Sequence, residues 1–169
     1  LNRDGLPLFE QINEKHITPA VNEVLKEIRL TIKNVESNQE DPNWQNFVYP
    51  LQKSNEKLSR VWSQINHLNS VVNNEKLRLI YNKNLTKVTK YYSELSQNKL
   101  IYKKFIKIKS GTYYRALTAP QKKIIADEIL GFELGGVALN NNKKIQFKKI
   151  LSKLSKLSAN FEENLLDSV

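Results

Sequence analysis

The chain has 169 residues, a formal net charge of +10, 40% hydrophobic residues and no cysteine. This hydrophobic content is enough to build a core, so composition excludes a disordered chain, and the lack of cysteine excludes disulfides and thiolate zinc sites. No apolar run approaches the roughly 18 residues of a membrane-spanning helix. The first fifteen residues carry charges unlike a secretory signal. We therefore expect a cytoplasmic location and no membrane partner.

The positive charge could indicate a nucleic-acid or acidic protein partner, because clustered Lys and Arg attract phosphate backbones. The excess is almost all lysine, however, and phosphate and base recognition favour the planar guanidinium group of arginine. Asn, Ile and Lys are also over-used together, which is typical of a compositional drift. We expect no nucleic-acid partner, and a freestanding basic binding module remains the alternative function.

The first helix is predicted to follow an extended lead-in over residues 1–17. Thr18 is a candidate N-cap, and Pro19 follows it at a position where the missing amide hydrogen does no harm. The pattern then places on one face Val21, Val24, Leu25, Ile28, Ile32 and Val35. A loop is expected over residues 37–43, which contain Asp41-Pro42.

A second helical stretch keeps one apolar stripe from Trp44 to Leu68, and Pro50 should bend or divide it. A short connection at residues 72–74 leads to a third helix. The apolar face of that helix ends in tyrosines and leucine; its members are Leu77, Ile80, Tyr81, Leu85, Val88, Tyr91, Tyr92 and Leu95. Both helices should bury these faces.

Three further helices are predicted in the second half. One, over residues 98–109, is apolar around much of its girth and should be enclosed by its neighbours. The next runs from Thr118 to a stop at Gly135-Gly136. The last begins near residues 140–142, with lysines opposite an inner face made of Phe147, Ile150, Leu151, Leu154, Leu157, Phe161 and Leu165.

These elements predict an all-α fold, a bundle of about six helices that forms a single domain over residues 1–169. The chain does not start with methionine, and its last helix runs on without a glycine or proline to stop it. We therefore interpret it as a fragment of a larger protein. Apolar residues that meet the missing part should then lie exposed, and the fragment could self-associate through them.

A catalytic or metal site is not predicted anywhere in the chain. A hydrolytic zinc site needs about three protein ligands, commonly two His one turn apart on a helix. Only His16 and His67 are present, far apart in sequence and without a ligand partner at metal spacing. A Ser-His-Asp triad would depend on the same two histidines. His67 is expected to pack or hydrogen-bond near the end of its helix.

Other chemically interesting residues have simpler interpretations. Asp127, Glu128 and Glu133 lie close in sequence, and Lys122 and Lys123 lie about one turn before Asp127, which favours a solvated charged face over an acid–base pair. Gly131 and Gly135-Gly136 are not preceded by a strand, as the glycines of a phosphate-binding loop would be. Their small size instead favours the end of a helix and the close approach of another helix.

The lysines of the last helix and a group of tyrosines could also contact a partner. The lysine face of the last helix is the ordinary way to solvate a helix, although it could touch an acidic surface; it comprises Lys148, Lys149, Lys153 and Lys156. The tyrosines could line a peptide groove or belong to the core, and the pattern does not decide between these roles; they are Tyr91, Tyr92, Tyr102, Tyr113 and Tyr114.

Several short strings follow one another in a fixed order along the chain. The opening carries Leu6-Pro7-x-Phe9, Ile12 and His16-Ile17-x-Pro19-Ala20. Later strings are His67-Leu68-Asn69-Ser70-Val71, Leu77-Arg78-x-x-Tyr81, Gln121-Lys122-Lys123, Phe132-Glu133-Leu134-Gly135-Gly136-Val137-Ala138-Leu139 and Leu154-Ser155-Lys156-Leu157 with Phe161. Together these strings resemble the N-terminal region of the thimet-oligopeptidase family of zinc metallopeptidases, and the likeness covers residues 6–169. Gly135 and Pro120 depart from the residues the family often has there.

The resemblance implies an all-helical, two-lobed peptidase that encloses a zinc site in a narrow channel and admits short peptides. This chain would form part of one lobe and supply a channel wall. The family's His-Glu-x-x-His helix and its further Glu ligand lie downstream, so the resemblance assigns no catalytic, metal or cofactor residue to this chain. Zinc, peptide substrates and a C-terminal catalytic lobe are implied for the whole protein only.

Overall fold

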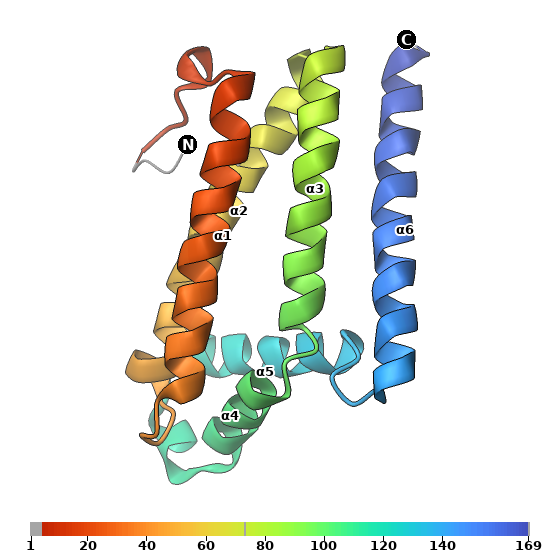
Figure 1. The fold of residues 1–169 in the computed structure, drawn as a ribbon. Helices are drawn as coiled ribbons and strands as arrows, with labels where there is room; N and C mark the ends of the chain where they lie inside the picture. Colours follow the sequence, from red (N-terminus) through yellow and green to blue (C-terminus); the bar gives the residue numbers. More distant parts are fainter. Residues whose placement is uncertain (1–4, 73, 169) are drawn as a thin grey trace.

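The computed structural model describes residues 5–72 and 74–168, which contain six α-helices and no strand. The helices are α1 (Glu14–Ser37), α2 (Tyr49–Val72), α3 (Glu75–Leu95), α4 (Lys99–Ser110), α5 (Ala119–Leu134) and α6 (Asn141–Asp167). Figure 1 shows α1, α2, α3 and α6 running lengthwise, while α4 and α5 cross one end. The all-α prediction is confirmed. None of the described helices combines the length and apolar character needed to cross a membrane.

The predicted start of the first helix is wrong. A 3₁₀ turn occupies Phe9–Gln11, and α1 begins at Glu14, so Pro19 lies inside the helix. The backbone N–H of Asn13 donates to Nδ1 of His16 at 3.4 Å, which helps to satisfy the helix entrance one turn before Thr18. The Thr18 hydroxyl instead accepts a 2.8 Å hydrogen bond from the Asn84 amide of α3.

Pro50 marks a change of helix type, as the sequence predicts. A π-helical turn occupies Trp44–Val48, and Pro50 is the second residue of α2. A proline is tolerated there because its missing N–H falls in the first turn. The loop after α1 also ends where expected, since the side chain of Asn43 caps the π turn through the N–H groups of Gln45 and Asn46. Residue 73, in the predicted connection after α2, lies outside the described residues.

The core has two parts. The first lies among α1, α2 and α3, where Ile17, Val21, Leu58, Val61 and Ile65 are fully buried. The second lies where α4 and α5 close the end of the bundle, and the rings of Phe47 and Phe105 meet there with centroids 4.8 Å apart. Burial of these apolar side chains is the main stabilising contribution to the fold.

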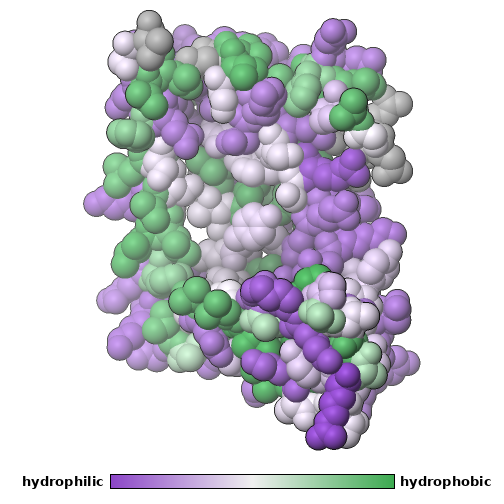
Figure 2. All heavy atoms as spheres, turned by 180° about the vertical axis from the view of Figure 1, so that it is seen from behind, coloured by the Kyte–Doolittle hydropathy of each residue, from purple (hydrophilic) through white to green (hydrophobic). Residues whose placement is uncertain are grey.

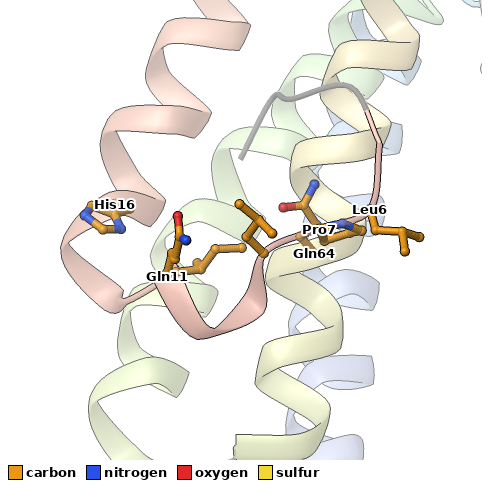
Figure 3. Close-up of a pocket in the computed structure, with 7 residues that line it drawn as sticks. Leu6, Pro7, Gln11, His16 and Gln64 are labelled. Carbon is orange, nitrogen blue, oxygen red and sulfur yellow. The ribbon is translucent and has the colours of Figure 1, made fainter.

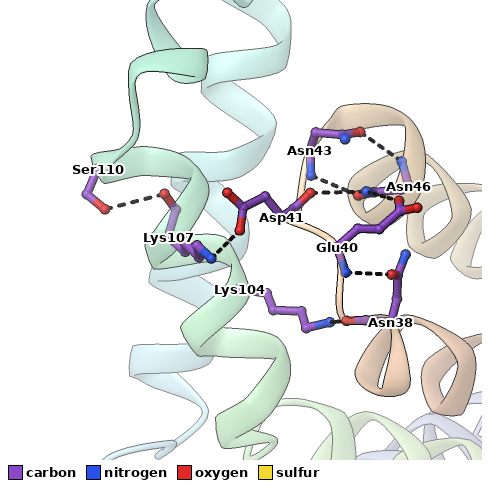
Figure 4. A network of polar contacts seen from close by, with 8 residues as sticks. All are labelled: Asn38, Glu40, Asp41, Asn43, Asn46, Lys104, Lys107 and Ser110. Atoms are coloured by element: carbon purple, nitrogen blue, oxygen red, sulfur yellow. Dashed lines mark hydrogen bonds and ion pairs between the residues drawn. The ribbon is translucent and has the colours of Figure 1, made fainter.

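A polar joint fixes α4 to the loop after α1 (Figure 4). The Lys104 ammonium donates to the backbone oxygens of Val35 at 2.5 Å and Asn38 at 2.7 Å. These oxygens belong to the C-terminal end of α1, where the helix dipole favours a cation. Lys107 forms an ion pair with Asp41 in the same loop. The joint therefore ties α4 to the C-terminal end of α1 and to the loop that follows it.

The prediction that α4 is enclosed by its neighbours is wrong. Ile101, Phe105 and Ile108 are buried, but Leu100 is 58% exposed and Ile106 is 37% exposed. The helix packs through one face on α5 and the second core, and its opposite face meets solvent. The apolar residues spread around α4 therefore did not show how many other elements pack against this helix.

The predicted inner face of α6 is also wrong. Ile150, Leu154, Leu157, Phe161 and Leu165 are each more than half exposed, and Phe147 and Leu151 are half-buried. α6 packs principally against α3 through a different face, whose contacts are polar. They include Thr89–Ser155 at 3.0 Å, Asn82–Glu163 at 2.8 Å and the ion pair Arg78–Asp167, in which the guanidinium lowers the pKa of the Asp167 carboxyl.

Candidate functional site

The two histidines lie in separate places. His16 borders a hollow of about 130 Å³ beneath the N-terminal segment, lined also by Gln11 and Gln64 (Figure 3). His67 packs on Phe9, with ring centroids 4.9 Å apart. The packing role predicted for His67 is confirmed. Sequence distance correctly indicated that the two rings would not share a site.

The donor groups of the chain do not suit a zinc ion. Within residues 5–72 and 74–168, no group of three or more His, Asp or Glu side chains lies close enough to hold a metal. The sequence has no cysteine to supply a thiolate. Zinc is held by three or four converging His, Cys or carboxylate ligands. The zinc implied for the family therefore has no fitting site in the described part of this chain.

The carboxylates of α5 occupy three different environments. Asp127 forms an ion pair with Lys123 one turn earlier, as the solvated-face interpretation predicts. Glu133 accepts a hydrogen bond from the Tyr102 hydroxyl at 3.1 Å. Lys122 turns away from these carboxylates and donates to the backbone oxygen of Arg115 at 3.1 Å. The three acids therefore do not form a shared acid–base pair.

Glu128 is the exception among these acids, because it is partly removed from water. Its Oε1 accepts a 2.7 Å hydrogen bond from the side-chain amide of Gln52 on α2. Desolvation raises the pKa of the Glu128 carboxyl; the bond from Gln52 opposes this change, and the charge of Asp127 adds to it. Sequence spacing had grouped Glu128 with the solvated acids, since burial by α2 leaves no local pattern.

The glycines at the end of α5 serve helix packing. A Cβ built on Gly135 would lie 2.3 Å from Cβ of Ser96 and 2.9 Å from the backbone oxygen of Gly131. Gly136 has φ of +83°, a conformation that favours glycine, and the N–H of Val137 donates to Phe132 O at 3.0 Å. The helix end and the close-packing role predicted for this segment are both confirmed.

Two hollows lie beside one another on the face formed by α2, α3, α5 and α6. One, of about 480 Å³, lies between α3 and α6, and the other, of about 260 Å³, lies between α3, α2 and α5. They share Tyr92 and Ser96, and Glu128 lines the second. Figure 2 looks onto this side of the molecule, where hydrophobic side chains follow the α6 edge and the centre is hollowed. We call this surface the hollow face.

The tyrosines divide between core and surface. Tyr91 is buried, and desolvation raises the pKa of its hydroxyl, which donates to Asn55 at 2.8 Å. Tyr92 is 43% exposed and points its accessible surface into the hollow face. Tyr113 is equally exposed but lies in the 3₁₀ turn Thr112–Ala116. Only the assembled helices distinguish these roles, because all of these tyrosines fit an apolar helical pattern.

The hollow face combines short hydroxyl side chains, the rings of Tyr92 and Phe132 and one desolvated acid, and within the described residues it contains no cluster that could perform metal-dependent hydrolysis. The sequence matches the model of a known protein family. The model of the "Neurolysin/Thimet oligopeptidase, N-terminal domain" matches residues 21–144. The chain belongs to the thimet oligopeptidase family. The strings that predicted this membership extend along the chain from the segment before α1 into α6.

Curated members of the thimet oligopeptidase family match almost the whole chain. Oligopeptidase A of Haemophilus influenzae is 36% identical over 168 residues, and oligopeptidase A of Escherichia coli is 31% identical over 163 residues. The probable cytosolic oligopeptidase A of Arabidopsis thaliana is 32% identical over 168 residues. These alignments cover 96–99% of this chain but 24% of each relative. The chain therefore spans about a quarter of the length of these oligopeptidases.

Proposed function

We propose that this chain is the N-terminal part of a cytoplasmic, zinc-dependent oligopeptidase that hydrolyses short peptides, and that the chain itself supplies no catalytic, metal or cofactor residue. The observation that carries the proposal is the match of residues 21–144 to the N-terminal domain of a peptidase family. The donor chemistry agrees with it, because the described histidines and carboxylates are dispersed. The chemistry that zinc supplies would belong to residues outside this chain.

The contribution of these helices is a wall of the space that receives the peptide. The hollow face suits this role because hydroxyls such as Ser96, and the ring of Tyr92, offer contacts that do not depend on one peptide sequence. Glu128 adds a carboxyl at the edge of the wall. The rigid crossing of α3, α5 and α6 would keep the wall in place while peptides enter and leave.

The partners in this proposal are short peptides and the C-terminal catalytic lobe, with neither nucleic acid nor a membrane among them. Several of the cations are already occupied, because Lys57, Arg78, Lys107 and Lys123 form ion pairs with carboxylates of this chain. The cytoplasmic location is supported by the name of the Arabidopsis relative, a probable cytosolic oligopeptidase A.

The experiment compares the full-length protein with residues 1–169 alone, using an internally quenched peptide short enough to enter a narrow channel. We expect the full-length protein to hydrolyse the peptide, to lose activity with a zinc chelator and to regain it on addition of Zn²⁺. The isolated chain should release no product under either condition. Hydrolysis by the isolated chain, or chelator-resistant hydrolysis by the full-length protein, would contradict the proposal.

A further inference from the structure

α6 presents an unpartnered apolar stripe on the outer edge of the molecule. The stripe consists of five large side chains, each more than half exposed: Ile150, Leu154, Leu157, Phe161 and Leu165. At about 100° per residue, these five positions fall within a sector roughly 80° wide. Figure 2 shows the hydrophobic side chains gathered along this edge. A continuous apolar surface of this kind marks an interaction site in a water-soluble fold.

The stripe cannot be explained by the packing of α6 inside the bundle. The contacts to α3 come from Ser155, Ala159 and Glu163, and Ala159 is the only side chain of α6 within the described residues that is buried. On the same helical projection, these three positions lie roughly 120–160° from the middle of the stripe. α6 therefore turns polar and small residues inward and its large apolar residues outward, the reverse of an ordinary surface helix.

The position of α6 in the family indicates what covers the stripe. The N-terminal domain model ends at residue 144, just after α6 begins at Asn141. Similarity to the H. influenzae oligopeptidase nevertheless covers 99% of this chain and only 24% of that relative. α6 is thus shared with the relatives but lies almost wholly beyond the residues that match the N-terminal domain model. Its outward face is in place to meet polypeptide that follows.

Charge argues against a second copy as the occupant. Lys149 and Lys153 lie along one flank of the stripe, and both are exposed. In an antiparallel pair related by a two-fold axis that covers the whole stripe, this flank would face the C-terminal half of the same flank on the other copy, where Asn160 and Asn164 cannot neutralise the lysines. Two chains that each carry a net charge of +10 also repel one another over longer distances. A surface with carboxylates beside an apolar groove fits this helix better.

We propose that α6 is a docking helix whose apolar stripe packs against the downstream part of the same polypeptide, in an apolar groove bordered by acidic side chains. This inference rests on the proposed function only in taking the chain as the N-terminal part of a longer oligopeptidase. The docking deepens that function, because α6 also lines the hollow face through Leu151 and Leu154. The same helix thereby joins the peptide wall to the catalytic lobe.

The test places single cysteines in the full-length protein, one variant at a time. Leu157→Cys probes the stripe, and Lys156→Cys is the matched control at the preceding exposed position, which lies roughly 140° from the middle of the stripe. Each variant is labelled with a maleimide under native conditions, and the α6 peptide is quantified by mass spectrometry so that other cysteines do not interfere. We expect the thiol introduced by Leu157→Cys to react at least about tenfold more slowly than the control, because docking excludes the reagent.

Equal labelling of the two positions would overturn the proposal. Protection of the stripe that disappears on dilution, together with dissociation of a dimer, would also overturn it, because the occupant would then be a second copy. Phe161→Cys, at a stripe position outside the hollow face, gives an independent reading should Leu157→Cys disturb folding, and hydrogen exchange of the α6 amides in the unsubstituted protein gives a third. None of these readouts depends on peptide hydrolysis, so an inactive protein with a protected stripe would refute the proposed function alone.

Discussion

At the scale of single residues, Glu128 is the acid whose environment most affects stability. Its pKa is raised above the ordinary 4.5, mainly by desolvation. The folded chain therefore binds this proton more tightly than the unfolded chain, and the carboxyl reduces stability once the pH rises above the ordinary pKa of 4.5. The hydrogen bond from Gln52 lessens this cost but does not remove it.

We expect Glu128→Gln to raise the melting temperature of the chain at pH 7, because the amide can keep the bond from Gln52 without a desolvated charge. The gain should shrink as the pH falls towards and below 4.5, where the wild-type carboxyl is protonated in both states. Glu23→Gln, at an exposed position on α1, makes the same change in net charge and should have little effect. A gain from Glu128→Gln that is independent of pH would contradict this account.

Single residues also show what sequence spacing can and cannot predict about the site. The separation of His16 and His67, and the pairing of Asp127 with Lys123, follow from local spacing and are found in the structure. The desolvation of Glu128 and the different exposures of Tyr91 and Tyr92 depend on helices that are distant in sequence. No periodicity within α3 or α5 contains that information.

At the scale of elements, the crossing of α5 and the end of α3 depends on one missing side chain. Gly135→Ala places a Cβ against Ser96 and the Gly131 carbonyl at distances that ordinary packing does not allow. We expect it to lower the free energy of unfolding by about 1–3 kcal/mol, the usual cost of overpacking. Urea denaturation of the chain followed by circular dichroism measures this change.

Gly131 supplies the matched control for that experiment. It lies in the same helix one turn earlier, and nothing lies within 4 Å of a Cβ built there. Gly131→Ala should therefore stabilise the chain by roughly 0.5–1 kcal/mol, through the better helix propensity of alanine. Equal effects of the two substitutions would show that the approach of α5 to Ser96 does not limit stability.

The elements themselves were largely predictable, because capping residues and 3.6-residue periodicity act locally. The structure places close to their predicted positions the end of α1, the division at Pro50 and both ends of α5. The start of α1 was misjudged because the cap is Asn13 with His16 rather than Thr18 with Pro19. The exposed faces of α4 and α6 were misjudged because periodicity identifies an apolar face but not the partner that covers it.

At the scale of the whole molecule, the hollow face and the stripe of α6 are two adjoining surfaces that share Leu154. We propose that the hollow face contacts the peptide and that the stripe packs against the rest of the polypeptide. Neither surface could be located from the sequence, since their exposure depends on how the helices are placed by tertiary packing. The sequence predicted only that exposed apolar residues should exist somewhere.

The peptide wall can be tested with a matched pair of tyrosines in the full-length oligopeptidase. Tyr92 and Tyr113 are both 43% exposed, but only Tyr92 lines the hollow face. We expect Tyr92→Ala to raise the KM for peptides several-fold with little change in kcat, because it removes a binding contact distant from the reacting atoms. Tyr113→Ala should leave both constants unchanged. Identical effects of the two variants would show that the hollow face does not bind the peptide.

The central claim is that the chemistry of the enzyme resides outside these helices, and zinc content measures it most directly. The full-length protein that carries both His16→Asn and His67→Gln should bind as much zinc per molecule as the unsubstituted protein. Both proteins are washed with a chelator and reloaded with Zn²⁺, and the zinc content of the folded material is measured by atomic emission. Loss of metal from the folded double variant would contradict the claim, because one of these histidines would then be a ligand.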